Sequence, residues 1–98
     1  MHHKELPIPP AATEGQVARE LARVWAAKGA QHVSIATDAW QDPAAWGIML
    51  VDLAKHVADA YAQIQGVDAA SALERIREGF DAEWDHPTCR PHGGLQDE

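Results

Sequence analysis

The chain has 98 residues, of which 46% are hydrophobic, and a formal net charge of −7. This length fits one domain, and the hydrophobic content indicates a folded core rather than a disordered chain. The charge argues against a nucleic-acid partner, because phosphate binding requires clustered Lys and Arg, and the eight basic residues here are scattered. Four tryptophans supply much of the capacity to bury apolar surface: Trp25, Trp40, Trp46 and Trp84.

Targeting and membrane signals are not evident. No apolar run approaches the roughly 20 residues that a membrane-spanning helix needs. The N-terminus lacks the basic start and the long apolar segment of a signal peptide. Cys89 is the single cysteine, so no internal disulfide can form. We therefore expect a soluble cytoplasmic protein without a membrane partner.

The two ends of the chain differ in composition from its middle. Residues 1–12 contain three prolines and no periodic pattern, which predicts an extended N-terminal arm. His2 and His3 fit a native segment and a cloning remnant equally well, since two histidines are too few to distinguish them. We expect one folded domain over residues 13–86 and a flexible tail over residues 87–98, in which prolines and glycines recur.

Residues 13–37 allow two interpretations. In one, Thr13 and Gln16 form a capping box and open a helix that ends at Gly29. In the other, residues 21–27 form a strand, Lys28 and Gly29 turn the chain, and residues 31–37 return as a second strand. The alternating pattern of the return segment favours this hairpin, with a short helical turn before it, although Lys-Gly is a weaker turn pair than Asn-Gly.

A two-residue turn would fix the register of the hairpin. Val24 would then face Val33, and Ala22 would face Ile35, which gives one apolar face. Side chains alternate along a strand, so the remaining pairs lie on the opposite face. This second face is mixed in character and contains two pairs: Trp25 with His32, and Arg23 with Ser34.

A long helix is predicted after the hairpin. Asp42 is a good N-cap, Pro43 fits the first helical position, and Gly66 should end the helix after about residue 65. One side carries a continuous apolar stripe that we expect in the core: Trp46, Leu50, Leu53, Val57, Ala60 and Ile64. The opposite side carries a polar stripe: Asp52, Lys55, His56, Asp59 and Gln63.

The start of this helix, residues 44–51, is apolar on every side. A surface helix of a small monomer normally keeps a polar face along its whole length. The polar stripe begins only at Asp52, so the first two turns should be covered by another layer or by another subunit.

A shorter helix should follow, beginning near Asp68 or Ser71. Ser71 and Glu74 match a second capping box, and Pro87 ends the helical pattern. Its apolar stripe consists of Leu73, Ile76, Phe80 and Trp84.

Four segments together resemble a small bacterial family known as domain of unknown function 5076. They are Arg-Val-Trp-Ala-Ala at 23–27, Gln-His-Val-Ser-Ile at 31–35, the run from Trp40 to Val57, and Arg-Glu-Gly-Phe-Asp-Ala-Glu-Trp at 77–84. The resemblance covers nearly the whole chain beyond the arm. It implies a strand at Arg-Val-Trp, which further favours the hairpin, and it implies no activity.

Three groups of residues could carry chemistry. Asp52 and His56, spaced by four on one helix face, could orient an imidazole as a general base, but an ordinary charged stripe fits them better. The Arg23, Trp25 and His32 face of the hairpin could bind an anionic or planar ligand, although packing against another subunit is the favoured interpretation. The third group, His86, Cys89 and His92, has two kinds of zinc ligand but no fourth ligand, so we predict no metal site.

The sequence therefore predicts an α+β fold, with an antiparallel β-hairpin followed by a long helix and a shorter C-terminal helix. A lone hairpin is marginal in water and leaves two open edges. We expect self-association into a homodimer or a larger closed oligomer that completes the sheet. The expected function is a non-enzymatic interaction or structural module without a cofactor. The alternative is a small-molecule-binding protein or minor enzyme that uses the Arg23, Trp25 and His32 face.

Overall fold

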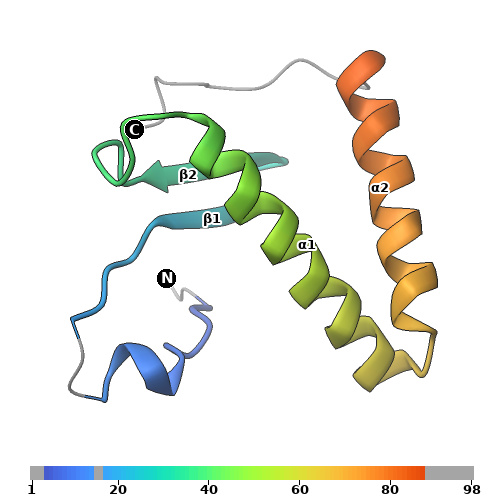
Figure 1. The fold of residues 1–98 in the computed structure, drawn as a ribbon, viewed down its shortest axis with the longest axis horizontal. Coiled ribbons are helices and arrows are strands. Elements are labelled where there is room, and N and C mark those ends of the chain that lie inside the picture. The colour runs from blue at the N-terminus through green and yellow to red at the C-terminus, as the bar shows by residue number, and fades with distance from the viewer. Residues whose placement is uncertain (1–3, 15–16, 88–98) are drawn as a thin grey trace. The chain divides into compact units, whose positions relative to one another are not determined.

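The computed structural model describes residues 4–14 and 17–87, which contain a 3-10 turn, an antiparallel hairpin and two helices (Figure 1). The described residues form two compact units that divide between residues 39 and 40. The first unit contains η1 (Pro10–Ala12), β1 (Ala22–Ala27) and β2 (Ala30–Ile35). The second contains α1 (Ala44–Gln65) and α2 (Ala69–Asp85). The predicted α+β arrangement is confirmed.

The hairpin has the register that the sequence predicts. Val24 pairs with Val33, and Ala22 pairs with Ile35. The mixed face carries the pairs Trp25 with His32 and Arg23 with Ser34. Residues 22–27 are a strand, so the alternative interpretation of a helix over residues 13–28 is wrong.

The turn between the strands uses a backbone conformation that L-residues seldom adopt. Lys28 has a φ of 53° and Gly29 a φ of 74°. Two successive residues with positive φ give a type I′ turn, whose twist matches that of the paired strands. This match lets the weaker Lys-Gly pair close the hairpin.

The hairpin ends earlier than predicted. The Ala36 N–H still donates to the Leu21 carbonyl at 2.9 Å, which continues the ladder past Ile35. The Ala39 N–H then donates to the Ala36 carbonyl at 3.1 Å. This local turn takes the chain out of the sheet, so β2 covers Ala30–Ile35 rather than residues 31–37.

The N-terminal arm is less extended than predicted, because it contains the single turn η1. The Thr13 N–H donates to the Pro10 carbonyl at 2.9 Å, and the Thr13 hydroxyl donates to the same oxygen at 3.0 Å. Pro10 suits the first position of a helical turn, since its missing N–H would have no partner there. Thr13 thus ends a helical turn instead of opening one. Its predicted capping partner, Gln16, lies outside the described residues.

Helix α1 begins and ends at the predicted signals, with a shift of one residue at the start. The Ala44 N–H donates to Asp42 Oδ1 at 3.0 Å, so the Asp42 carboxylate contacts the first helical residue. The N-cap position itself is Pro43, one residue later than the predicted Asp42. Pro43 forms a turn, and the helix itself begins at Ala44. At the other end, Gly66 has a φ of 72°, which is the left-handed conformation common after helices.

Helix α2 begins at its N-cap Asp68, the first of its two predicted starts. The Asp68 carboxylate accepts the Ser71 N–H at 3.0 Å and the Ser71 hydroxyl at 3.1 Å. Asp68 is therefore the N-cap, and Ser71 is already helical, so the predicted capping box of Ser71 with Glu74 is wrong. The Asp68 carboxylate is a stronger hydrogen-bond acceptor than the Ser71 hydroxyl. The Asp68 backbone also has the extended conformation that an N-cap requires.

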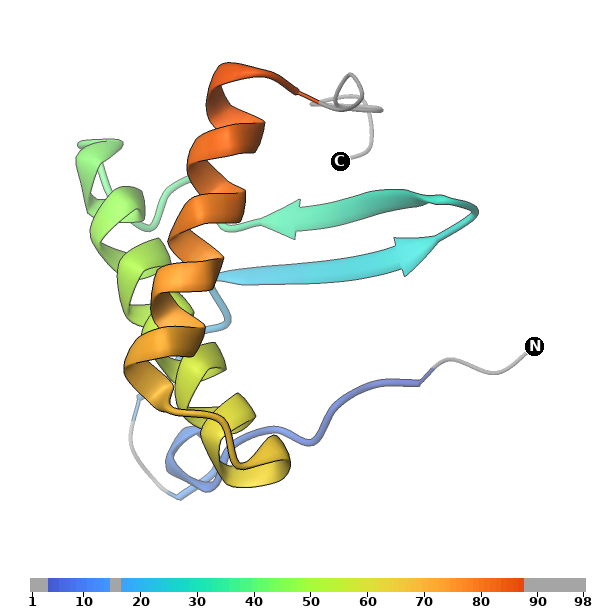
Figure 2. The same cartoon turned by 90° about the vertical axis from the view of Figure 1, so that its right-hand side faces the viewer.

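The two helices lie side by side and antiparallel (Figures 1 and 2). Their contact centres on small side chains: Ala58 of α1 is 2% exposed, while Ala54 and Ala62, one turn to either side, are half-buried. Alanines let two helix backbones approach closely. Within the described part of the chain, Ala58 is the sole fully buried residue.

Four of the five described aromatic residues of this unit form two ring pairs. Trp40 and Trp46 meet edge to face at the start of α1, with ring centroids 5.0 Å apart. Phe80 and Trp84 stack near the end of α2 at 5.5 Å. Both residues of the second pair are exposed. Neither α1 nor α2 is apolar over enough of its length to cross a bilayer.

Candidate functional site

The mixed face of the hairpin brings together the three residues that the sequence singled out. Trp25 on β1 and His32 on β2 are directly opposite and half-buried, and Arg23 lies two residues along β1 on the same face. The His32 ring lies 3.2 Å from the Ala27 carbonyl through Nε2. A carbonyl can only accept, so Nε2 carries the hydrogen, and in the neutral ring the proton-accepting nitrogen is Nδ1.

Arg23 is already engaged by two carboxylates. Its Nε and one terminal nitrogen bind the two oxygens of Glu20, both at 3.1 Å, and its other terminal nitrogen binds Glu5 at 2.9 Å. The hydrogen bonds and the charge of Glu20, followed by those of Glu5, raise the pKa of Arg23. The positive charge that an anionic ligand would require is thus balanced within the chain.

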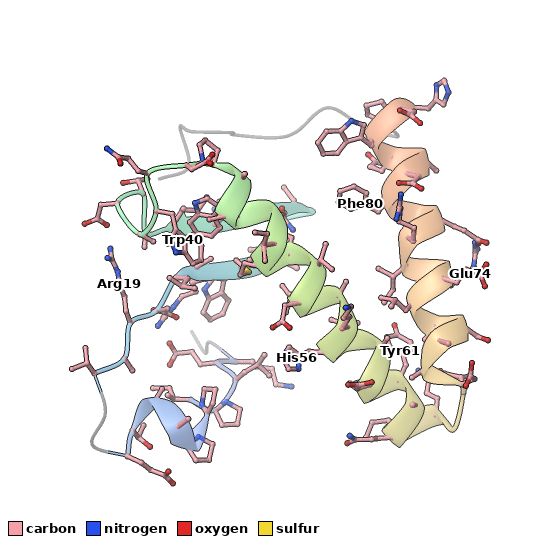
Figure 3. The ribbon with its side chains drawn as sticks, viewed as in Figure 1. Arg19, Trp40, His56, Tyr61, Glu74 and Phe80 are labelled. Carbon is pink, nitrogen blue, oxygen red and sulfur yellow. The ribbon has the colours of Figure 1, made fainter. Side chains whose placement is uncertain are left out.

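The helix pair Asp52 and His56 does form. Asp52 Oδ2 and His56 Nε2 are 3.2 Å apart, and both side chains are more than two-thirds exposed. His56 lies on the side of α1 away from α2, in the polar stripe (Figure 3). A general base works best with restricted solvent access and a defined substrate position, and this pair has neither.

Of the group His86, Cys89 and His92, the structure describes only His86. His86 follows the last turn of α2, where its N–H donates to the Ala82 carbonyl at 2.8 Å. Cys89 and His92 lie outside the described residues, as does most of the predicted tail. Across residues 4–14 and 17–87, no three His, Cys, Asp or Glu side chains are grouped closely enough to hold a metal ion.

A groove between the two helices was not predicted from the sequence. Its volume is about 450 Å³, and it is open to solvent. Tyr61 and Phe80 lie on the facing sides of the two helices, whereas Glu74 lies on the far side of α2 (Figure 3). Apolar side chains dominate the groove, with one cation at its rim: Val57, Tyr61, Val67, Ser71, Ala72, Ile76 and Arg75. The cation is compensated, since Arg75 binds Glu78 at 2.7 Å.

The predicted core stripe of α1 is largely exposed. The exposed fraction is 48% for Leu50, 49% for Leu53 and 83% for Ile64. Helical geometry places this stripe roughly 110° around α1 from Ala58, which marks the side that meets α2. Val57 of this stripe lines the groove beside α2, whereas Leu50, Leu53 and Ile64 remain largely exposed.

The all-apolar start of α1 is also exposed in part. Ile48 is 74% exposed and Val51 is 56% exposed, whereas Met49 is half-buried. Large aliphatic side chains lose on the order of 1.5–3 kcal/mol of favourable transfer free energy when they stay in water rather than being buried. Contiguous surfaces of this kind mark sites of association.

Comparison with known proteins gives a family without an assigned function. The family model of DUF5076, a domain of unknown function, matches residues 5–88. A solved structure from the photosynthetic bacterium Rhodopseudomonas palustrus CGA009, provisionally named a pyruvate dehydrogenase, is similar to this chain. The two are 36% identical, each is covered over 91% of its length, and the TM-score is 0.68. No curated protein matches. The chain belongs to the DUF5076 family.

Proposed function

We propose that this protein is a non-enzymatic module that works as a homodimer or a larger closed oligomer, in a structural role or as a platform for a protein partner. The exposed stripe of α1 carries this proposal: Leu50, Leu53 and Ile64 line one helix face and remain in water. Homodimer interfaces are rich in such apolar surface. A second copy is always present at equal concentration, and it would cover this face on both chains.

The hairpin supports the same proposal. Val24 is 59% exposed and Ile35 is 43% exposed, although both lie on the apolar face. Two strands alone rarely form a stable sheet in water. Association would extend the sheet and cover apolar side chains at the same time.

The described residues that could carry chemistry favour a non-enzymatic role. Asp52 and His56 are open to water, and Arg23 is neutralised by Glu5 and Glu20. Neither arrangement supplies a reacting group held against a shielded substrate.

Light scattering at tens of micromolar protein tests the proposal. The wild-type chain should give at least twice the monomer mass of 10.7 kDa. Leu53→Glu, which places a charge on the stripe, should shift the mass towards the monomer. Gln63→Glu adds the same charge on the polar side of α1 and should leave the assembly intact. A wild-type mass equal to that of the monomer would refute self-association.

The mixed hairpin face supports a second candidate function, the binding of a small planar or anionic molecule. The observation in its favour is the pairing of Trp25 with His32, both half-buried, beside Arg23. Thermal unfolding across a panel of anions and metabolites tests it. A stabilising ligand whose effect disappears in His32→Gln would support binding. If no compound raised the unfolding temperature of the wild-type chain, this second function would be rejected and only the first would remain.

A further inference from the structure

The outer edge of β2 presents backbone groups that have no strand partner in the described part of the chain. The Ala36 N–H bond to the Leu21 carbonyl fixes the phase of the ladder. In an antiparallel pair, hydrogen-bonded and non-hydrogen-bonded positions alternate. The groups of His32 and Ser34 therefore point towards β1. Those that point outwards from β2 belong to three residues: Gln31, Val33 and Ile35.

The β2 edge also lacks the features that normally prevent strands from pairing. Its six residues, Ala-Gln-His-Val-Ser-Ile, include no proline, no carboxylate, no Lys and no Arg. Natural edge strands are usually protected by such residues. β1 differs, because it carries Arg23, whose side chain holds Glu5 of the arm. In both ribbon views the arm lies on the β1 side of the hairpin (Figures 1 and 2).

We propose that β2 pairs antiparallel with β2 of a second copy of this chain, with Val33 on the two-fold axis. The inference rests on the proposed function, and it names the β2 edge as one contact between copies, in addition to the contact proposed at the α1 stripe. Gln31 of one copy would face Ile35 of the other, and Val33 would face its own equivalent. These are the residues whose backbone groups point outwards, so each can exchange hydrogen bonds with its counterpart.

The residues of β2 favour a two-fold axis through Val33 over the alternative axis through His32. An axis through His32 would place the two imidazoles directly opposite each other and would set Ile35 against Gly29 of the turn. An axis through Val33 instead places each His32 opposite Ser34 of the other copy. It also keeps residues 30–36 within the ladder, so more of the strand is paired.

The four-stranded sheet would keep its two faces distinct. A two-fold axis perpendicular to the sheet leaves the apolar face of both hairpins on the same side. The exposed side chains of Val24 and Ile35 would then join their equivalents in one continuous apolar layer. Three strands or more with an apolar face meet the requirement for a stable sheet, which one hairpin does not.

Amide hydrogen exchange on the intact protein gives the first test. The outward amides of Gln31, Val33 and Ile35 should exchange on the order of 100-fold more slowly than the outward amides of Ala22, Val24 and Ala26 on β1. Dilution that dissociates the assembly should remove the difference. Protection of His32 and Ser34 is expected in either case, because β1 already bonds them.

A disulfide cross-link gives the second test. Facing residues in a hydrogen-bonded antiparallel pair have Cα atoms roughly 5.5 Å apart, which a disulfide can bridge. In a Cys89→Ser background, Val33→Cys should oxidise to a covalent dimer with the same native mass and circular dichroism as the wild-type protein. Val24→Cys is the matched control, because it sits opposite Val33 on β1 and should remain reduced.

The outcomes separate this inference from the proposed function. Slow outward β2 amides together with a Val33→Cys cross-link would support the shared edge. An assembled protein with fast outward β2 amides, or one that cross-links through Val24→Cys instead, would overturn the β2 edge and leave self-association standing. A monomeric wild-type protein would overturn both.

Discussion

Arg19 and Asp38 form an ion pair that joins the chain just before β1 to the chain just after β2. They continue the hairpin register, since Ala22 pairs with Ile35 and Leu21 bonds to Ala36. The hydrogen bond from Arg19, a backbone hydrogen bond and the positive charge of Arg19 together lower the pKa of Asp38. The open end of the hairpin is therefore held by a charged contact as well as by the backbone ladder.

This contact predicts a pH dependence. The pKa of Asp38 is lower in the folded chain than in the unfolded chain, so the ionised carboxylate favours folding. The contribution is complete above the unfolded pKa of about 3.9 and is lost as the pH falls through the lower folded value. The effect on stability should be small, because the pair is exposed.

The measurement is an NMR titration of the Asp38 carboxyl group. Arg19→Gln should raise the pKa of Asp38 towards the ordinary value of 3.8. Lys28→Gln removes one positive charge at the turn, the opposite end of the same hairpin, and should leave the titration of Asp38 unchanged. Identical Asp38 curves in the wild-type chain and in Arg19→Gln would show that the pair does not persist in solution.

The type I′ turn predicts opposite effects at two neighbouring positions. Lys28→Asn should stabilise the fold by up to about 1 kcal/mol, because Asn tolerates positive φ better than Lys. Gly29→Ala should destabilise it by about 1–2 kcal/mol. An added methyl group at Gly29 would meet no atom within 4 Å, so the cost arises from the backbone conformation rather than from a clash.

Chemical denaturation followed by circular dichroism measures both turn variants. Each keeps the hydrogen-bonded strands unchanged, and only the preference for positive φ differs. If Lys28→Asn proved less stable than the wild-type chain, Lys28 would not occupy the left-handed region in solution.

The hairpin register could be predicted because two independent features specify it. Side-chain alternation along residues 31–35 defines one face, and a two-residue turn at Lys28 and Gly29 sets the pairing. Shifting either strand by one residue would reverse its faces. The contacts of Arg23 with the arm were not predictable, because Glu5 lies 18 residues away in a segment without periodicity.

The packing side of α1 could not be read from its hydrophobic pattern. Large apolar side chains such as Leu53 and Ile64 mark the stripe, and the pattern says only that this side avoids water. The contact with α2 instead uses Ala58, which adds little to any hydrophobic pattern. Small side chains reveal a close helix contact only when the second helix is in place.

The cap of α2 gives a third prediction. Asp68→Ala should cost about 1 kcal/mol of stability, since it removes the acceptor of the Ser71 N–H. Glu74→Ala should have little effect, because Asp68 rather than Ser71 caps the helix. The two variants each remove one carboxylate, so thermal unfolding at one pH compares them directly. A larger loss of stability in Glu74→Ala than in Asp68→Ala would contradict the Asp68 cap and support the capping box of Ser71 with Glu74.

The close approach of α1 and α2 gives the last prediction. Ala58 is 2% exposed at the helix contact, whereas Ala60 is exposed two residues along the same helix. Ala58→Leu should destabilise the protein by about 1–3 kcal/mol, because the larger side chain must push the helices apart. Ala60 belongs to the apolar stripe, so the comparison applies to the dissociated chain. There Ala60→Leu inserts the same atoms into open space and should change the free energy of unfolding by less than about 0.5 kcal/mol.

Denaturant titration of both leucine variants at low micromolar concentration measures the difference. Both substitutions exchange alanine for leucine, and leucine is a comparably good helix former, so helix propensity cancels between them. What remains is the space that each position offers. A destabilised Ala60→Leu beside an unaffected Ala58→Leu would place the packed side of α1 on its apolar stripe instead, and this stripe would then not be available to a second copy.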